Sequence, residues 1–261
     1  MCLLLLAVGV DANMPLVVAA NRDEFRDRPS APAAFWEDAP GILAGRDLEA
    51  GGTWLGVSRS GRFAAVTNVR DGRAARSAAR SRGRLVSGFL SSRDDAETYL
   101  RLAADEARLY GGFNLVAGGV DGLFWLSNRA PSAVAVRVSR GVHGISNALL
   151  DTPWPKLTAA RESLASLLGS ARATAEPRAL PASLFGLLSD TSRADDAQLP
   201  DTGIGLERER ILAPAFIDTP EYGTRTSTVV FFRADGSVEL EERTHESGRP
   251  NVEERRFSFT I

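Results

Sequence analysis

The chain has 261 residues, 44% of them hydrophobic, which is enough to bury the core of a folded globular protein. Its 31 basic and 33 acidic residues nearly cancel, so the chain lacks the strong positive charge that attracts nucleic acid or anionic membranes. A single cysteine excludes an internal disulfide framework, and with only two histidines it argues against a dedicated zinc site, so we expect no metal and no cofactor.

The apolar stretch that opens the chain does not have the pattern of a signal peptide or a membrane anchor. No basic residue precedes residues 3–10, and Asp11 interrupts the stretch before any small-residue cleavage site. The stretch is also much shorter than the roughly 20 apolar residues that a membrane-spanning helix needs. We therefore expect a cytoplasmic protein that does not insert into membranes.

Short apolar strands are predicted in the first part of the chain. Residues 2–10 and 16–20 are apolar runs separated by turn-forming residues, which predicts a hairpin at the start of the fold. Because both runs are continuously apolar, both faces of this hairpin are expected to be covered. A second hairpin is predicted at 53–58 and 63–68, and an Arg- and Ala-rich segment follows at 70–84.

The rest of the chain contains both helical and strand patterns. Helices are predicted at about 84–90, 95–110, 153–168 and 182–188. Further strands are predicted at 113–117, 123–126, 134–138, 142–146, 226–233, 237–242 and 252–260. Residues 189–205 are rich in Asp, Ser and Gly, so we expect an irregular excursion there and regard it as a candidate pocket lid.

This order of elements differs from the strand–helix alternation of a doubly wound sheet. Strands come first, in the middle and last, with the helices gathered between them. The order predicts an α+β fold in which two mostly antiparallel sheets pack face to face with helices outside. No repeat and no linker marks a boundary, so we expect one domain over residues 1–261.

Cys2 is the first residue that points to chemistry. If Met1 is removed, Cys2 carries a thiol and a free α-amine, and an N-terminal amine is a recognised base for activating a nucleophile. The usual pKa values of the amine (about 7.7–8.0) and the thiol (about 8.5) make proton transfer between them nearly thermoneutral. The alternative is that Cys2 is a small apolar residue at the start of a buried strand.

Four polar residues, Asn21 to Glu24, end the strand that is expected to pair with the Cys2 strand. Strand alternation places Asn21 and Asp23 on one face and Arg22 and Glu24 on the other. A carboxylate beside Cys2 could hold its α-ammonium, and a guanidinium could favour its thiolate. The alternative is a cluster of surface ion pairs, which contributes little to stability.

Several motifs along the whole chain closely resemble those of the NRDE-motif family, also called the Transport and Golgi organisation family. These motifs lie at residues 1–2, 21–24, 51–56, 67–70, 112–115, 144–147 and 224–228. The resemblance implies a four-layer αββα sandwich of the N-terminal-nucleophile hydrolase kind. More distantly, the pattern is similar to the cysteine amidases that include penicillin V acylases and bile salt hydrolases.

The similarity to these amidases implies roles for particular residues. Cys2 corresponds to the nucleophile and Asp23 to the acid that binds its amine. Asn68 and Asn147 correspond to the asparagines that hold the oxyanion and orient the amine, and Arg225 corresponds to a late active-site arginine.

Four further residues of the motifs are expected to contact a substrate: Asn21, Arg22, Thr53 and Trp54. The amidases have an arginine three residues before the aspartate, where this chain has Ala20. Arg22 is therefore the candidate to replace that arginine.

Two functions remain open from the sequence. The first is an amidohydrolase that cleaves a non-peptide linear amide or related acyl bond of a small molecule through an acyl-enzyme. The second is a non-catalytic binding or trafficking protein for haem or for a lipid-like or acyl-CoA ligand, since the family has been linked to haem and lipid homeostasis. Neither predicts nucleic acid as a partner.

Other residues also have two interpretations. Each asparagine alone fits the cap of a turn or of a strand end. The arginines of 70–84 could contact an acidic group of a ligand, but no aromatic residues interleave with them and a solvated loop explains them too. His143 is expected to be structural, with haem ligation as the alternative.

Overall fold

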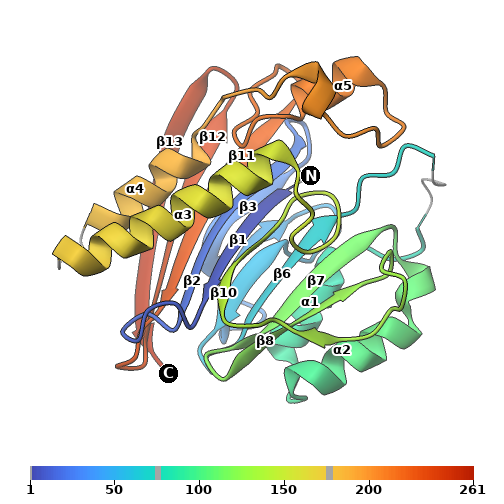
Figure 1. Cartoon of the computed structure of the whole chain (residues 1–261). Coiled ribbons are helices and arrows are strands. Elements are labelled where there is room, and N and C mark those ends of the chain that lie inside the picture. The colour runs from blue at the N-terminus through green and yellow to red at the C-terminus, as the bar shows by residue number, and fades with distance from the viewer. Residues whose placement is uncertain (1, 74–77, 175–178) are drawn as a thin grey trace.

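The structure is a computed structural model of the chain, and it describes residues 2–73, 78–174 and 179–261. The side chains of Cys2 and of residues 171–174 lie outside this description. Over the described ranges, the strands form two antiparallel sheets that lie face to face between helices (Figure 1).

The first sheet contains both the N-terminal hairpin and the C-terminal strands. Its order is β10-β1-β2-β11-β12-β13, so the chain's first strands lie at the centre beside strands from its end. The strands are β1 (Cys2–Val8), β2 (Leu16–Phe25), β10 (Gly141–Ile145), β11 (Tyr222–Phe232), β12 (Ser237–Glu246) and β13 (Arg249–Thr260).

The second sheet is built from the middle of the chain, and its strands follow one another in sequence order from β3 to β9. Neighbouring strands are therefore connected by hairpins or loops, except that a long segment containing helices, residues 69–112, connects β6 to β7. The strands are β3 (Ser30–Phe35), β4 (Ile42–Asp47), β5 (Leu55–Ser58), β6 (Phe63–Asn68), β7 (Phe113–Gly119), β8 (Gly122–Ser127) and β9 (Val136–Arg137).

Helices cover the outer face of each sheet. The helices are α1 (Gly83–Ser91), α2 (Ala96–Asp105), α3 (Pro155–Thr174), α4 (Leu180–Leu188) and α5 (Leu206–Ile211), with short 3-10 turns at Ala107–Leu109 and Asp196–Gln198. Helices α3 and α4 pack on β1, β2, β10 and β11, and helices α1 and α2 pack on the second sheet. Nowhere in the described part of the chain is a helix both long and apolar enough to cross a membrane.

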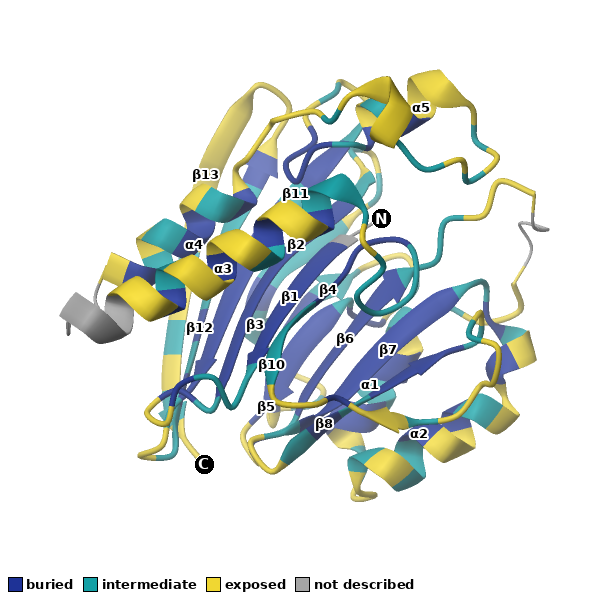
Figure 2. Cartoon of the chain, viewed as in Figure 1, coloured by how far each residue is buried: buried dark blue, intermediate teal, exposed yellow. Residues whose placement is uncertain are grey.

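Strand alternation explains why the first strands are apolar on both faces. Leu4 and Leu6 of β1 point into the core between the sheets, where they join Phe63 of β6. Leu3 and Leu5 point the other way, into the core beneath α3 and α4. The central strands of both sheets are accordingly buried along their length (Figure 2).

The structure confirms the predicted α+β class and its αββα layers. The predicted hairpins are present, but β2 continues through the polar tetrad to Phe25. The strand predicted at 134–138 is reduced to Val136–Arg137, and the helix predicted at 95–110 ends at Asp105.

Sequence patterns missed β3, β4 and α5. The β3 sequence, SAPAAF, is rich in alanine and contains Pro32, which has no N–H to donate to a ladder. The pairing of β3 with β4 shifts register between Ala31 and Ala34, beside this proline. Helix α5 is only six residues long, which is too short for a helical repeat of apolar residues to be recognised.

A close approach of two backbones joins the loop before β5 to the start of α1. A Cβ added to Gly52 would lie 2.5 Å from the carbonyl carbon of Gly83 and 2.7 Å from its oxygen. The Thr53 amide donates to the same oxygen at 3.3 Å. Glycine at position 52 is therefore required for this packing.

We expect Gly52→Ala to destabilise the protein by about 1–3 kcal/mol, because backbone must move to admit the methyl group. Gly186→Ala is the matched control: it lies in α4, nothing lies within 4 Å of its added Cβ, and alanine should stabilise the helix by about 0.5–1 kcal/mol. Chemical denaturation measures both changes. Equal changes in the free energy of unfolding for the two substitutions would contradict the close contact between Gly52 and the Gly83 backbone.

Candidate active site

Backbone pairing places the start of β1 between two polar segments. Cys2 pairs with Arg22 of β2, so the tetrad lies beside it. On the other side of β1, Leu4 pairs with Ile145 of β10 in antiparallel register. Asn147 follows Ile145 by two residues, just beyond the end of β10.

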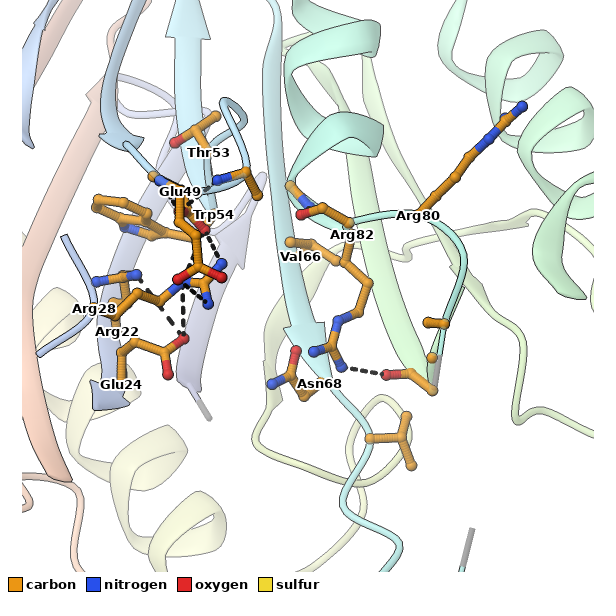
Figure 3. A pocket seen from close by; sticks show the side chains of 18 of the residues that line it. Arg22, Glu24, Arg28, Glu49, Thr53, Trp54, Val66, Asn68, Arg80 and Arg82 are labelled. Atoms are coloured by element: carbon orange, nitrogen blue, oxygen red, sulfur yellow. Dashed lines mark hydrogen bonds and ion pairs between the residues drawn. The ribbon is translucent and has the colours of Figure 1, made fainter. Parts of the chain in front are cut away.

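A pocket of about 650 Å³ opens at this end of the molecule. Its lining includes Arg22, Asp23, Thr53, Trp54 and Asn68 among the residues that we predicted for the site. Figure 3 shows the Arg22 and Trp54 side chains on one wall and the Asn68 side chain on the other. The structure thus brings together residues from three segments that lie far apart in the sequence.

Arg22 forms the wall of this pocket as a buried cation. Its side chain is only 4% exposed, and its guanidinium carbon lies 4.2 Å from the centre of the Trp54 ring. Glu24 Oε2 lies 3.9 Å from Arg22 Nη2, which is a long ion pair. Ala20, which stands where the amidases have their arginine, packs in the core between the sheets. In β2 the arginine that lines the pocket is Arg22.

Asp23 is almost fully buried, and its carboxylate accepts a hydrogen bond from Thr224 Oγ1 at 2.7 Å. Burial raises the pKa of Asp23, while nearby positive charge, including that of Lys156, and the Thr224 hydrogen bond oppose the rise. A buried carboxylate in this setting is suited to pair with a cation such as an ammonium group.

Asn21 lies on the opposite face of β2 from Arg22 and does not line the pocket. Its Nδ2 donates to the carbonyl oxygens of Leu188 and Ala215, both at 2.8 Å, and its Oδ1 accepts from Ser227 Oγ at 2.6 Å. The side-chain amide is therefore occupied in joining β2 to the end of α4. These bonds favour a structural role for Asn21, and its predicted contact with a substrate stays a prediction.

His245 completes the network that holds Asn21. Its Nε2 lies 2.9 Å from Ser227 Oγ, and its Nδ1 accepts from the Asn251 amide at 3.0 Å. Burial lowers the pKa of His245 to about 4, so the ring is neutral at pH 7. With Nδ1 as the acceptor, Nε2 carries the proton and donates to Ser227.

Asn147 is not among the residues that line the pocket, but its side chain contacts Asn68, which is. Asn68 ends β6, and its side chain lines the pocket. Asn147 is buried and donates from Nδ2 to the Asn68 carbonyl oxygen at 3.1 Å. The two predicted asparagines are therefore in contact, although they come from different sheets.

Arg225 also lies outside the pocket lining. Its Nη1 donates to the backbone oxygens of Phe25, Arg26 and Arg28 at 2.9 to 3.1 Å. It therefore holds the loop after β2, and two of the residues that it holds, Phe25 and Arg28, line the pocket. These contacts favour a role for Arg225 in shaping the pocket edge, and its predicted direct role in catalysis stays a prediction.

Other candidates lie away from the pocket. His143 bonds through Nδ1 to Asp151 Oδ2 at 2.7 Å, and this bond raises the pKa of His143. No residue of 189–205 lines the pocket, so the expectation of a lid there is not supported. Within the described ranges, no three His, Cys, Asp or Glu side chains converge in a way that could hold a metal.

The arginine-rich segment 70–84 falls partly outside the described residues, because 74–77 are among those left out. Two of its described arginines form exposed ion pairs, Arg73 with Asp201 and Arg80 with Glu106. Arg82 lines the pocket and donates to the Gly112 carbonyl oxygen at 3.1 Å (Figure 3).

Glu242 is a buried acid that sequence patterns did not identify. Its Oε1 accepts from the Ala33 amide at 2.6 Å, and its Oε2 lies 3.2 Å from Thr228 Oγ1, so it joins β12 of the first sheet to β3 of the second. Burial raises the pKa of Glu242 to about 7, against the opposing effects of these bonds and of Arg22. Nothing in the local sequence distinguishes it from Glu239 and Glu241.

Comparison with known proteins identifies a family and a related fold. The sequence profile described as Transport and Golgi organisation 2 matches residues 1–247. A Transport and Golgi organization protein 2 homolog of Bos taurus is 40% identical over 245 residues, which cover 88% of this chain and 86% of that protein. The homolog of Homo sapiens is 37% identical over 262 residues, with coverage of 94% and 92%.

A solved enzyme has a similar fold. The C2A mutant of a conjugated bile acid hydrolase from Clostridium perfringens matches with a TM-score of 0.52 and 8% identity, covering 98% of this chain and 92% of that one. At this identity the likeness concerns the fold alone.

Glu242 should make stability depend on pH. The folded-state pKa of about 7 lies above the ordinary value of 4.5, so native Glu242 keeps its proton where the unfolded chain has lost it. Its contribution is therefore fully present below pH 4.5 and is lost as the pH rises through 7, by roughly 3 kcal/mol in total.

Glu242→Gln can imitate the protonated acid, because its amide oxygen can accept from Ala33 and its nitrogen can donate to Thr228. We expect the variant to gain stability over the wild type as the pH rises from about 5 to 7 and to keep that gain above 7. Urea denaturation across this range measures the difference, with Glu239→Gln on the same strand as control. A difference that does not change with pH would contradict the burial effect.

Proposed function

The chain belongs to the Transport and Golgi organisation 2 family, and from this premise we propose that it is an amidohydrolase with an N-terminal cysteine nucleophile. Its substrate would be a small molecule with a linear, non-peptide amide or a related acyl bond, cleaved through an acyl-enzyme. The observation that carries the proposal is the position of Cys2 in the fold. The start of β1 lies between the tetrad and Asn147, at the pocket lined by Asp23 and Asn68.

The first half of the proposed reaction forms the acyl-enzyme. After removal of Met1, the α-amine of Cys2 takes the thiol proton, and the sulfur attacks the carbonyl carbon of the substrate. The amide groups of Asn68 and Asn147 donate to the oxyanion; one Nδ2 hydrogen of Asn147 goes to Asn68, which leaves the second for this purpose. The carbon–nitrogen bond then breaks as the ammonium returns its proton to the leaving nitrogen.

The second half releases the acyl group. The α-amine takes a proton from water, which attacks the thioester, and the collapse of the second tetrahedral intermediate returns the thiol and frees a carboxylic acid. Asp23 is the acid that would pair with the ammonium whenever the amine holds the proton. Arg22, paired with Cys2 across the strands, would favour the thiolate.

One observation favours the second candidate function, the binding of a lipid-like ligand such as an acyl-CoA without turnover. Phe25 lines the pocket although the residue is 56% exposed, and its ring packs edge-on against Tyr222 with ring centres 5.2 Å apart. These rings offer an apolar surface at the pocket. Haem has less support, because neither His143 nor His245 lines the pocket.

We expect the protein purified without Met1 to gain the mass of one acyl group when it is incubated with a panel of amides and acyl esters. Cys2→Ala should abolish the adduct, and Asn68→Ala and Asn147→Ala should each slow its formation by about 100- to 1,000-fold, as for other oxyanion donors. Asn128→Ala serves as a control amide, because Asn128 itself does not line the pocket and its side chain bonds only backbone atoms, those of Ala107, Tyr110, Gly111 and Phe113. Intact mass measured over time reports all four variants.

If protein that lacks Met1 gains no acyl group with any compound of the panel, the proposed hydrolysis is contradicted. Saturable binding of an acyl-CoA or of haem by the same chain, with no adduct and no loss in Cys2→Ala, would instead support the binding function. Titration at micromolar ligand, with Phe25→Ser to test the apolar surface and His143→Ala to test haem ligation, separates the two ligands.

A further inference from the structure

Arg70, two residues after β6, binds Asn147 through both its backbone and its side chain. The Arg70 amide donates to the Asn147 carbonyl oxygen at 2.7 Å, and Arg70 Nη2 donates to Asn147 Oδ1 at 3.2 Å. Asn147 in turn donates to the carbonyl oxygen of Asn68. These bonds link the second sheet, which contains β6, to the segment after β10 in the first sheet.

A buried acid holds Arg70 from behind. Glu209 of α5 forms an ion pair with Arg70, and the two side chains are 3% and 5% exposed. Glu209 Oε1 also accepts from the Thr202 amide at 3.0 Å and from Thr202 Oγ1 at 2.5 Å. The Trp154 ring lies 4.9 Å from the Arg70 guanidinium carbon. Both carboxylate oxygens of Glu209 therefore have partners, and the orientation of Arg70 is defined on several sides.

The charge on Arg70 also acts on the Asn147 amide. Burial lowers the pKa of Arg70, and the adjacent Glu209 carboxylate opposes that shift and keeps the guanidinium charged. An amide whose oxygen accepts from a cation becomes a better donor at its nitrogen, because the hydrogen bonds polarise one another. A charged Arg70 would thus both orient Asn147 and strengthen its N–H donors.

We propose that Arg70, held by Glu209, is a positioning residue for hydrolysis that fixes the Asn147 amide beside Cys2. This inference rests on the proposed function, because it assigns Asn147 a donor role in the reaction. It makes α5 part of the active-site support, at the same end of the molecule as the N-terminus (Figure 1). The 201–211 segment would then support the site from behind rather than cover the pocket.

The alternative is that these bonds only tether the 201–211 segment. A second ion pair offers a matched control, because Arg73 Nη2 and Asp201 Oδ2 lie 2.9 Å apart and join the same two segments of the chain. That pair is 63% and 82% exposed and does not contact Asn147. If the ion pairs only hold this segment in place, loss of Arg70–Glu209 and loss of Arg73–Asp201 should change the acylation rate equally.

The test compares Arg70→Lys, Glu209→Gln and Arg73→Ala in the full chain, with the fastest substrate of the acyl panel. Lysine keeps the charge but loses the planar fork that reaches Glu209 and Asn147 together. We expect Arg70→Lys to slow acylation by about 10- to 100-fold with little change in KM, as for small misplacements of catalytic groups. Glu209→Gln should have a smaller effect in the same direction, and Arg73→Ala should leave both parameters unchanged.

Hydrogen exchange provides a readout that does not need turnover. Loss of the Arg70 contacts should raise amide exchange at residues 68–73 and 145–152 in Glu209→Gln and Arg70→Lys but not in Arg73→Ala. If Arg70→Lys does not fold, the single variants Thr202→Val and Glu209→Gln still test whether Glu209 positions Arg70. Each of them weakens the contacts that orient the Arg70 side chain.

Two results would overturn the inference: acylation slowed no more than in Arg73→Ala, or unchanged exchange at 145–152. If the wild type forms no adduct, the proposed function fails on its own, and the assignment of a reaction role to Arg70 fails with it. Increased exchange at 145–152 would then show only that Arg70 orders this segment.

Discussion

The position of β1 between β2 and β10 is the constraint on which the site depends. Because β1 is central in its sheet, its first residue cannot move independently of the strand ends on either side. The register with β2 brings the tetrad beside Cys2, and the pairing with β10 ends two residues before Asn147. The same strand carries leucines into both cores, so hydrophobic burial holds the register in place.

Buried polar groups surround the start of β1, and hydrogen bonds from other elements hold several of them in place. The tetrad divides between two tasks: Arg22 and Asp23 line the pocket, whereas the Asn21 amide joins β2 to α4 through Leu188 and through Ala215. Glu242 connects the sheets behind Arg22, and its raised pKa shows the cost of burying a carboxylate there. Charges withdrawn from water in this way are costly unless they have partners, which is why so much of the local sequence is polar and hydrogen-bonded.

Periodicity was enough to predict the layers, because long apolar runs such as that of β1 have few alternatives in a chain of this size. It failed where the signal is weak, as in the alanine- and proline-containing β3 and in the short α5. Residue roles were harder to predict. Strand alternation separates Arg22 from Asn21, but only tertiary contacts reveal that Asn21 bonds the end of α4 and that Arg225 bonds the backbone of the loop after β2. Glu242 and Glu209 could not be identified in the sequence, since their burial depends on strands and loops distant along the chain.

The central claim is that Cys2 is an activated nucleophile with its own amine as the base, and the chain's single cysteine makes it directly testable. The rate at which a small alkylating agent modifies the folded chain without Met1, measured against pH, gives the pKa of the Cys2 thiol. We expect the rate to reach its plateau at a pH well below the ordinary thiol pKa of about 8.5. In Asp23→Asn, where the ammonium loses its acidic partner, we expect the midpoint of the profile to move to higher pH. A profile with the ordinary midpoint and no response to Asp23→Asn would contradict the central claim.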